Sequence, residues 1–294
     1  MFENIVGNEN IKKALINSIN AGTISHSYLF VGKSGIGKKL FAKELAKKVM
    51  CLGKENCESC IKFDSNSNPD FSLIVPDGKS IKVDQIRSMQ TKIVEKPITS
   101  SKKVYIIDDA DLMSEESQNC LLKTLEEPPE YAMIILIASN ENRMLQTIKS
   151  RCVIIRFEDL TDEQIANYLK IEDKEIIKLC GGSLEKAEKI QEKKDFYLQI
   201  KNLENALEKN SLINVFNYSE ILTNSKEDIL ECLEYLNIIF FEKCKTNINC
   251  AKAISIVEET KKKIIANNNF DMSIDYMLIH IWEELNGKSS RSKI

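Results

Sequence analysis

The chain has 294 residues, of which 43% are hydrophobic and 29% charged, a composition typical of a globular protein with room for about two domains. Its net charge of −3 does not mark a dedicated nucleic-acid-binding protein, although local lysine clusters could still contact a phosphate backbone. Nine cysteines, most of them within apolar runs, favour a reducing compartment over a disulfide-bonded secreted domain.

The N-terminal segment MFENIVGNENIKKALINSI contains an early glutamate and no long apolar run, so it is not predicted to be a signal peptide. No stretch approaches the roughly 20 apolar residues that a bilayer-spanning helix needs. We therefore expect a cytoplasmic protein without contact with a membrane.

The first half of the chain alternates short apolar runs with amphipathic stretches. The apolar runs predict five β-strands, at residues 27–31, 71–75, 103–109, 132–139 and 152–157. The amphipathic stretches predict helices at 38–50, 83–93 and 114–127, the last with Ser114 as its N-cap. Strands that are apolar throughout and separated by helices predict an α/β fold, with a parallel sheet covered on both faces.

After residue 157 the pattern becomes helical. Thr161 and Gln164 have capping-box spacing, and Gly181-Gly182 separates two helical stretches. The last helix carries an apolar stripe, formed by Ile274, Met277, Leu278, Ile281, Trp282 and Leu285. The sequence thus predicts three domains: an α/β domain over 1–157, a small helical lid over 158–198 and a helical collar over 199–294.

The stretch GKSGIGKK at residues 32–39 follows the first predicted strand and precedes a helix. Gly32, Gly35 and Gly37 allow the backbone to aim several N–H groups at one anion, and the helix adds its positive end. Lys38 would reach the β- and γ-phosphates of a nucleotide. The alternative is an ordinary glycine-rich turn between a strand and a helix.

Lys39 departs from this phosphate-binding pattern, which has Ser or Thr at that position. The missing hydroxyl would ligate Mg²⁺, whereas an ammonium group repels the ion. We therefore expect no Mg²⁺ site and impaired hydrolysis, while binding of ATP or ADP stays open.

The strand VYII ends in Asp108 and Asp109, where carboxylates suit magnesium coordination and activation of water. ATPases of this type usually have Asp followed by Glu. Asp109 is one methylene shorter than glutamate, so its carboxylate is expected to fall short of an attacking water. A solvated acidic turn is the alternative interpretation.

Arg151 lies just before the last predicted strand, in a chain that otherwise uses lysine nearly everywhere. A planar, bidentate guanidinium suits an arginine finger that reaches the γ-phosphate of a neighbouring subunit. On residue type alone, a salt-bridged arginine at the start of a strand is favoured.

Cys51, Cys57 and Cys60 form a second cluster, in which Cys57 and Cys60 have the spacing of a metal knuckle. A structural zinc site needs four ligands, and Phe63 stands where a fourth cysteine would follow. Asp64 or water is a weakly supported substitute. Free thiols in a reducing cell are the alternative, so Zn²⁺ is a candidate only.

Together these motifs resemble the AAA+ clamp-loader subunits of bacterial DNA polymerase III, and the delta prime subunits most of all. In chain order the resemblance rests on FENIVGNENIKKAL, HSYLFVGKSGIGKK, IKVDQIRSM, VYIIDDADLMSEESQNCLLKTLEEPP and SRC. It covers residues 2–157 strongly and continues to about residue 190. Beyond that it rests on helical character alone.

The resemblance implies a ring of five subunits, with gamma/tau and delta subunits, the sliding clamp and primer-template DNA as partners. It also implies that Arg151 of the SRC motif reaches the ATP site of the adjoining gamma/tau subunit, which reverses the preference drawn from residue type. The family's zinc module has four cysteines, of which three match here. A sensor arginine of the active ATPase subunits would fall near Glu185, and a first sensor at Ser139 or Asn140.

Lys39, Asp109 and Glu185 are three departures that point the same way. The sequence predicts a subunit that helps to load the clamp, does not itself hydrolyse ATP and donates Arg151 to a neighbour. An ATP-hydrolysing motor subunit of the gamma/tau type is the alternative, and a zinc-dependent DNA-binding module is a third hypothesis.

Overall fold

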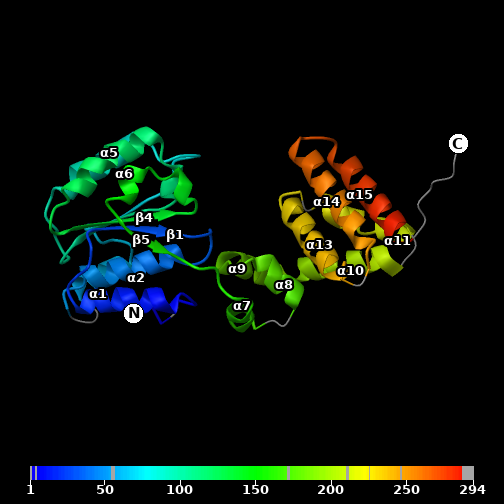
Figure 1. Cartoon of the computed structure of the whole chain (residues 1–294), viewed down its shortest axis with the longest axis horizontal. Coiled ribbons are helices and arrows are strands. Elements are labelled where there is room, and N and C mark those ends of the chain that lie inside the picture. Colours follow the sequence, from blue (N-terminus) through cyan, green and yellow to red (C-terminus); the bar gives the residue numbers. More distant parts are fainter. Residues whose placement is uncertain are drawn as a thin grey trace. The chain divides into compact units, whose positions relative to one another are not determined.

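The computed structural model describes residues 2–3, 5–53, 57–170, 173–209, 212–224, 226–245 and 247–286 (Figure 1). The chain divides into two units. The first contains Met1–Gln164 together with Gly182–Glu185, and the second contains Ile165–Gly181 and Lys186–Ile294. The division into three domains at residues 157 and 198 stays a prediction.

A five-stranded parallel sheet forms the centre of the first unit. Its strands are β1 Ser27–Val31, β2 Phe71–Ile74, β3 Lys103–Ile107, β4 Ala132–Ala138 and β5 Val153–Arg156. They lie in the order β2-β3-β4-β1-β5, and every neighbouring pair is parallel. The five predicted strands are confirmed, each with ends within two residues of the expected ones.

Helices cover both faces of this sheet (Figure 1). The helices of the first unit are α1 Glu9–Asn20, α2 Lys38–Met50, α3 Glu58–Asp64, α4 Val83–Ile93, α5 Glu115–Glu126 and α6 Gln146–Lys149, with short 3₁₀ turns η1 Ala110–Leu112 and η2 Glu141–Arg143. Tyr28 and Phe30 of β1 pack in the core with α1 and α2. Leu29 and Val31 point the other way, into the core with α4 and α5. The predicted α/β fold is therefore confirmed.

The sheet order brings three strand ends together at one edge. β1 pairs with β4, and β4 pairs with β3, so the segments that follow these strands are neighbours. The segment after β1 is the glycine-rich loop of residues 32–39, and β3 is followed by Asp108 and Asp109. The carboxyl ends of parallel strands at such a crossover are the usual place for a ligand in an open α/β sheet.

Three short helices follow the sheet, namely α7 Asp162–Leu169, α8 Lys174–Cys180 and α9 Leu184–Glu192. The predicted capping box is present: the Thr161 N–H donates to the Gln164 side chain at 3.0 Å, and the Gln164 N–H donates to the Thr161 hydroxyl at 3.2 Å. Gly181 ends α8 in the left-handed conformation, as the predicted break requires.

The remaining described elements of the second unit are helices: α10 Lys194–Lys209, α11 Leu212–Phe216, α12 Ser219–Asn224, α13 Ile229–Lys243, α14 Cys250–Ile265 and α15 Phe270–Leu285. The predicted stripe of α15 is its core face, because Ile274, Met277, Leu278 and Ile281 are fully buried. Among the described helices, none has both the length and the apolar character needed to cross a bilayer.

Candidate functional site

The glycine-rich loop is held from one side by the segment that begins α9. The backbone N–H groups of Leu184 and Glu185 donate to the carbonyl oxygen of Gly35 at 2.8 and 3.2 Å. A Cβ atom at residue 35 would lie 2.1 Å from the Ser183 hydroxyl, and Gly35 has a φ of +77°. Only glycine fits this position, because any side chain would both clash and strain the backbone.

Lys38 begins α2 and folds back over the loop. Its side chain is buried, and its ammonium group donates to the carbonyl oxygens of Gly32 at 2.6 Å and Lys33 at 2.5 Å. Burial lowers the pKa of Lys38, and the negative charge of Asp109 and Asp108 opposes that shift. The cation therefore lies between the loop and the acidic end of β3.

Lys39 forms an ion pair with Asp108, with 2.9 Å between Nζ and the carboxylate. The Asp108 side chain is only 15% exposed, so this pair is shielded from water on the carboxylate side. A magnesium ion at such a loop needs oxygen ligands at about 2.0–2.1 Å, from a hydroxyl on the helix and a carboxylate after the strand. Here an ammonium takes the place of the hydroxyl and also neutralises the carboxylate.

Asp109 lies in the left-handed region with a φ of +49°. Burial raises its pKa, and repulsion from Asp108 and Asp111 adds to the effect. Asp111, which the sequence analysis did not single out, is buried and accepts the backbone N–H groups of Ser139 at 3.0 Å and Asn140 at 3.2 Å. Asp111 thus ties the end of β4, where a first sensor was expected, to the end of β3.

Arg151 lies between α6 and the edge strand β5. One guanidinium nitrogen donates to the Thr147 carbonyl at 2.9 Å, and the other end forms an ion pair with Glu126. Glu126 is the last residue of α5, so the LLKTLEEPP and SRC motifs meet in this pair. These contacts do not reach the glycine-rich loop, and the Arg151 side chain is 32% exposed.

The three cysteines of the predicted metal cluster come together. The sulfur atoms of Cys51 and Cys57 lie 3.9 Å apart, those of Cys57 and Cys60 lie 3.5 Å apart, and all three fall within 4.8 Å of one another. Sulfur atoms around a tetrahedral zinc with Zn–S bonds of about 2.3 Å are separated by about 3.8 Å. The donor set therefore fits three ligands of a zinc ion.

The residues after Cys60 do not complete this set. Phe63 packs on Phe71, with ring centroids 4.6 Å apart, and belongs to the edge of the core. The Asp64 carboxylate forms an ion pair with Lys47 at 2.7 Å. Among the described residues, the cluster of potential metal ligands therefore contains the three cysteines and no carboxylate.

The pKa of the Cys57 thiol lies below its ordinary value. Hydrogen bonds from the backbone N–H groups of Leu52 and Cys60 lower the pKa of Cys57 to about 7. About half of the molecules of a thiol with this pKa carry the thiolate at pH 7, which is the form that binds metal.

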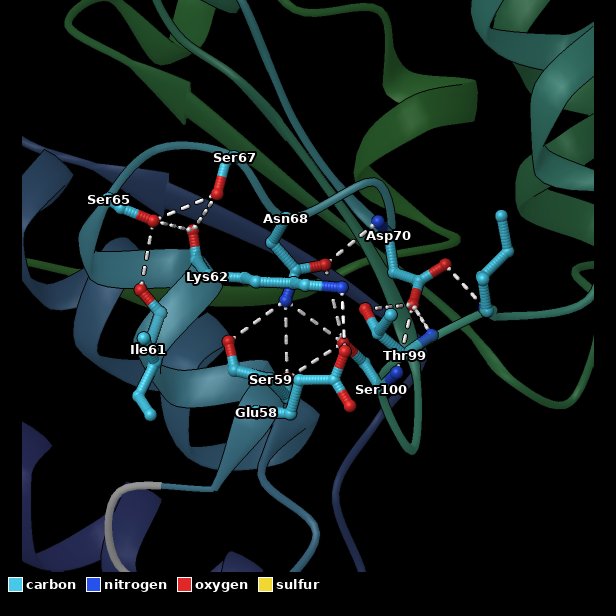
Figure 2. A network of polar contacts seen from close by, with 11 residues as sticks. Glu58, Ser59, Ile61, Lys62, Ser65, Ser67, Asn68, Asp70, Thr99 and Ser100 are labelled. Atoms are coloured by element: carbon cyan, nitrogen blue, oxygen red, sulfur yellow. Dashed lines mark hydrogen bonds and ion pairs between the residues drawn. The ribbon is translucent and has the colours of Figure 1, made fainter.

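A buried carboxylate organises the loop next to this cluster (Figure 2). Asp70 precedes β2 and accepts the backbone N–H groups of Ile98, Thr99 and Ser100, at 2.7 to 2.9 Å. Burial alone would raise the pKa of Asp70, but these hydrogen bonds outweigh it and the pKa lies below its usual value. Because the folded-state pKa is lowered, Asp70 stabilises the fold above about pH 4 and the stabilisation is lost on acidification.

Asp70→Ala is expected to lower the free energy of unfolding at pH 7 by about 3 kcal/mol, because three backbone N–H groups lose a charged, buried acceptor. Urea denaturation followed by circular dichroism measures this loss. Asp77→Ala is the matched control, since Asp77 pairs with Lys82 at an exposed site. An equal loss of stability in both variants would contradict the role assigned to the buried carboxylate.

The strand order, parallel register and covering helices define an α/β domain with a glycine-rich loop after its first strand, followed by helices. The family model described as "DNA polymerase III, delta subunit" matches residues 7–161, which is more than half of the chain. The chain belongs to this family, and the resemblance drawn from its motifs is confirmed.

Individual relatives agree with this assignment. The chain is 43% identical over 168 residues to DNA polymerase III subunit delta' of Bacillus subtilis (strain 168), which covers 55% of this chain and 51% of the relative. It is 35% identical over 191 residues to subunit gamma/tau of Mycoplasma pneumoniae, covering 63% of this chain and 28% of that one. The match thus spans about half or less of these relatives.

A solved structure extends the comparison to nearly the whole chain. The crystal structure of a DNA polymerase III gamma subunit-related protein from Thermotoga maritima covers 94% of this chain and 99% of its own, with a TM-score of 0.57. At 19% sequence identity this likeness shows the fold alone.

Proposed function

We propose that this chain is a delta prime-type subunit of a bacterial replicative clamp loader, which helps to place the sliding clamp on primed DNA without hydrolysing ATP itself. The ion pair between Lys39 and Asp108 is the observation that carries the proposal. It puts positive charge where a magnesium ion would lie and neutralises the carboxylate that would hold it.

Two further features near the loop also argue against ATP hydrolysis by this chain. Glu185 lies against Gly35, and the family resemblance puts the sensor arginine of active ATPase subunits near this position, where this chain has an acidic residue instead. Asp109 has a side chain one methylene shorter than that of glutamate, which places its carboxylate farther from an attacking water. Each feature disfavours hydrolysis on this chain, while leaving weak binding of ATP or ADP open.

Arg151 is the residue that would act in a neighbouring subunit. It lies beside the edge strand β5, where a second protein can approach, and its guanidinium is held by a carboxylate and a carbonyl. In the proposed ring the γ-phosphate of a gamma/tau subunit replaces Glu126 as its anionic partner. An arginine supplied in this way stabilises the charge of the phosphoryl-transfer transition state.

The proposed partners are the gamma/tau and delta subunits, the sliding clamp and primer-template DNA within the assembled loader. The family assignment and the two named relatives support membership in this complex. The net charge of −3 agrees with contact with DNA only as part of the assembly.

Reconstitution tests this proposal. The purified chain is mixed with gamma/tau and delta subunits, and native mass spectrometry gives the composition of the complex. We expect a ring with one copy of this chain, DNA-dependent ATPase activity in the ring, and no magnesium-dependent turnover by the chain alone. ATP hydrolysis by the isolated chain that Lys38→Ala abolishes would instead support an ATP-hydrolysing motor subunit.

We also propose that Cys51, Cys57 and Cys60 hold a Zn²⁺ ion. The separations of their sulfur atoms suit thiolate ligands around one metal, and Cys57 ionises near neutral pH. When bound, the ion would cross-link the end of α2 to α3, which is a structural role.

A further inference from the structure

A buried polar network connects the two segments that carry the three thiols. We propose that two of its members, Ser59 and Asn68, are positioning residues for a thiolate site that binds a divalent cation of the zinc class. The inference rests on the zinc site proposed above and adds how the chain builds that site. In this view the network brings the thiols together before metal binds.

Ser59 makes the central connection. It lies on α3 between Cys57 and Cys60, its side chain is buried, and its hydroxyl donates to the carbonyl oxygen of Met50 at 3.1 Å. Met50 is the last residue of α2 and directly precedes Cys51. One hydrogen bond therefore joins the helix that carries two thiols to the segment that carries the third.

Asn68 holds Ser59 in this orientation (Figure 2). Its buried amide nitrogen donates to the Ser59 carbonyl at 3.0 Å and lies 3.2 Å from the Ser59 hydroxyl. The same nitrogen donates to the Ser100 hydroxyl at 3.1 Å, and the Ser59 and Ser100 hydroxyls lie 2.7 Å apart. The Asn68 amide oxygen accepts the Asp70 N–H at 2.9 Å, which fixes the amide itself.

The loop of residues 98–101 supports the segment of Cys51 from the other side. The Ser101 N–H donates to the Met50 carbonyl at 3.2 Å, and the Ser101 hydroxyl donates to the Val49 carbonyl at 2.6 Å. Asp70 fixes the same loop through three backbone N–H groups. The end of α2 is therefore held by the network and by this loop, neither of which uses a metal.

This arrangement has a thermodynamic consequence. When the ligands are disordered before binding, the entropy cost of ordering them lowers the affinity for the metal. When the thiols already lie close together, binding does not carry this cost. Groups that orient metal ligands through hydrogen bonds typically contribute roughly 10- to 100-fold in metal affinity. Removing the Asn68 amide should weaken binding by about this factor, although Asn68 is not itself a ligand.

Titration with Co²⁺ under anaerobic conditions tests the proposal on the full-length chain. Thiolate-to-cobalt charge transfer reports the number of thiolates bound, and competition with Zn²⁺ gives the zinc affinity. We expect the wild-type chain to bind one ion, and Asn68→Ala and Ser59→Ala to bind roughly 10- to 100-fold more weakly with reduced charge-transfer intensity. Ser65→Ala is the control, because this exposed hydroxyl bonds to Ile61 and Lys62 at the end of α3.

Each outcome has a defined meaning. A wild-type chain that binds neither Co²⁺ nor Zn²⁺ overturns the zinc site and this inference together. Wild-type affinity retained within about twofold by folded Asn68→Ala and Ser59→Ala overturns the inference alone and leaves the zinc site standing. If Asn68→Ala does not fold, Ser100→Ala removes a loop-borne member of the network and is judged by the same criterion.

Discussion

Arg151→Ala is expected to lower the DNA-dependent ATPase of the reconstituted clamp loader by at least about threefold, although residue 151 lies outside the glycine-rich loop. An arginine finger is typically worth 10³–10⁵ in rate at the site that it serves. One copy of the chain in the ring would supply one such arginine to one ATP site. The loss of ATPase rate in the whole ring therefore depends on how strongly the other ATP sites are coupled to that site. Arg151→Lys should not restore the rate, because an ammonium lacks the planar fork that binds two phosphate oxygens.

Arg156→Ala is the matched control for this experiment. Arg156 lies at the end of β5, and one edge of its guanidinium donates to both carboxylate oxygens of Glu141, at 2.7 and 3.0 Å. Its loss should leave the ATPase of the ring within about twofold of the wild type. If the Arg151→Ala subunit assembles normally and the ring still hydrolyses ATP at the wild-type rate, the arginine-finger role is excluded.

The strands and the loop were predictable because their signals are local. Each strand is an apolar run bounded by polar or turn-forming residues, and the loop has glycines where the backbone needs positive φ. The capping box at Thr161 and the N-cap at Ser114 are also local patterns, and both are confirmed. The helices α1 and α3 were not predicted, although the polar first turn of α1 carries a usable signal in Glu9.

The contacts that define the candidate site join residues that are far apart in the chain. Ser183 and Glu185 reach Gly35 across about 150 positions, and Glu126 reaches Arg151 from a different helix. Gly35, Glu126 and Arg151 lie in motifs that are recognisable in the sequence, but no local pattern pairs any of them with its partner. Asp111 was overlooked for a related reason, since a third acidic residue after Asp108 and Asp109 looks like part of a solvated turn.

The thiol cluster divides in the same way. The metal-knuckle spacing of Cys57 and Cys60 was enough to predict that these two thiols lie close together. The network that holds the cluster was not predictable, since Asn68 and Ser100 are polar residues in loops and resemble many exposed ones. The burial of Asn68 becomes visible only when β2 and α3 are placed side by side.

In the Lys39→Thr variant, Mg²⁺ is expected to raise the affinity for ATP by at least about tenfold over the affinity that this variant has without the metal. The substitution removes the ammonium that lies 2.9 Å from Asp108 and supplies a hydroxyl in its place. The freed carboxylate and the hydroxyl can then both face a hydrated magnesium ion bound to the phosphates. Isothermal titration calorimetry with and without Mg²⁺ measures the difference.

The Lys39→Thr variant should still not hydrolyse ATP, because binding of Mg²⁺ and hydrolysis depend on different residues. The Asp109 side chain stays one methylene shorter than that of glutamate, and residue 185 is still not an arginine. Lys48→Thr, an exposed substitution farther along α2, should leave Mg²⁺ dependence unchanged and controls for a general effect of charge. Lys39→Thr could bind nucleotide no better with Mg²⁺ than without it. That result would show that the ion pair between Lys39 and Asp108 is not what excludes the metal. Glu185 would then be the stronger candidate, because a negative charge there would repel the phosphates themselves.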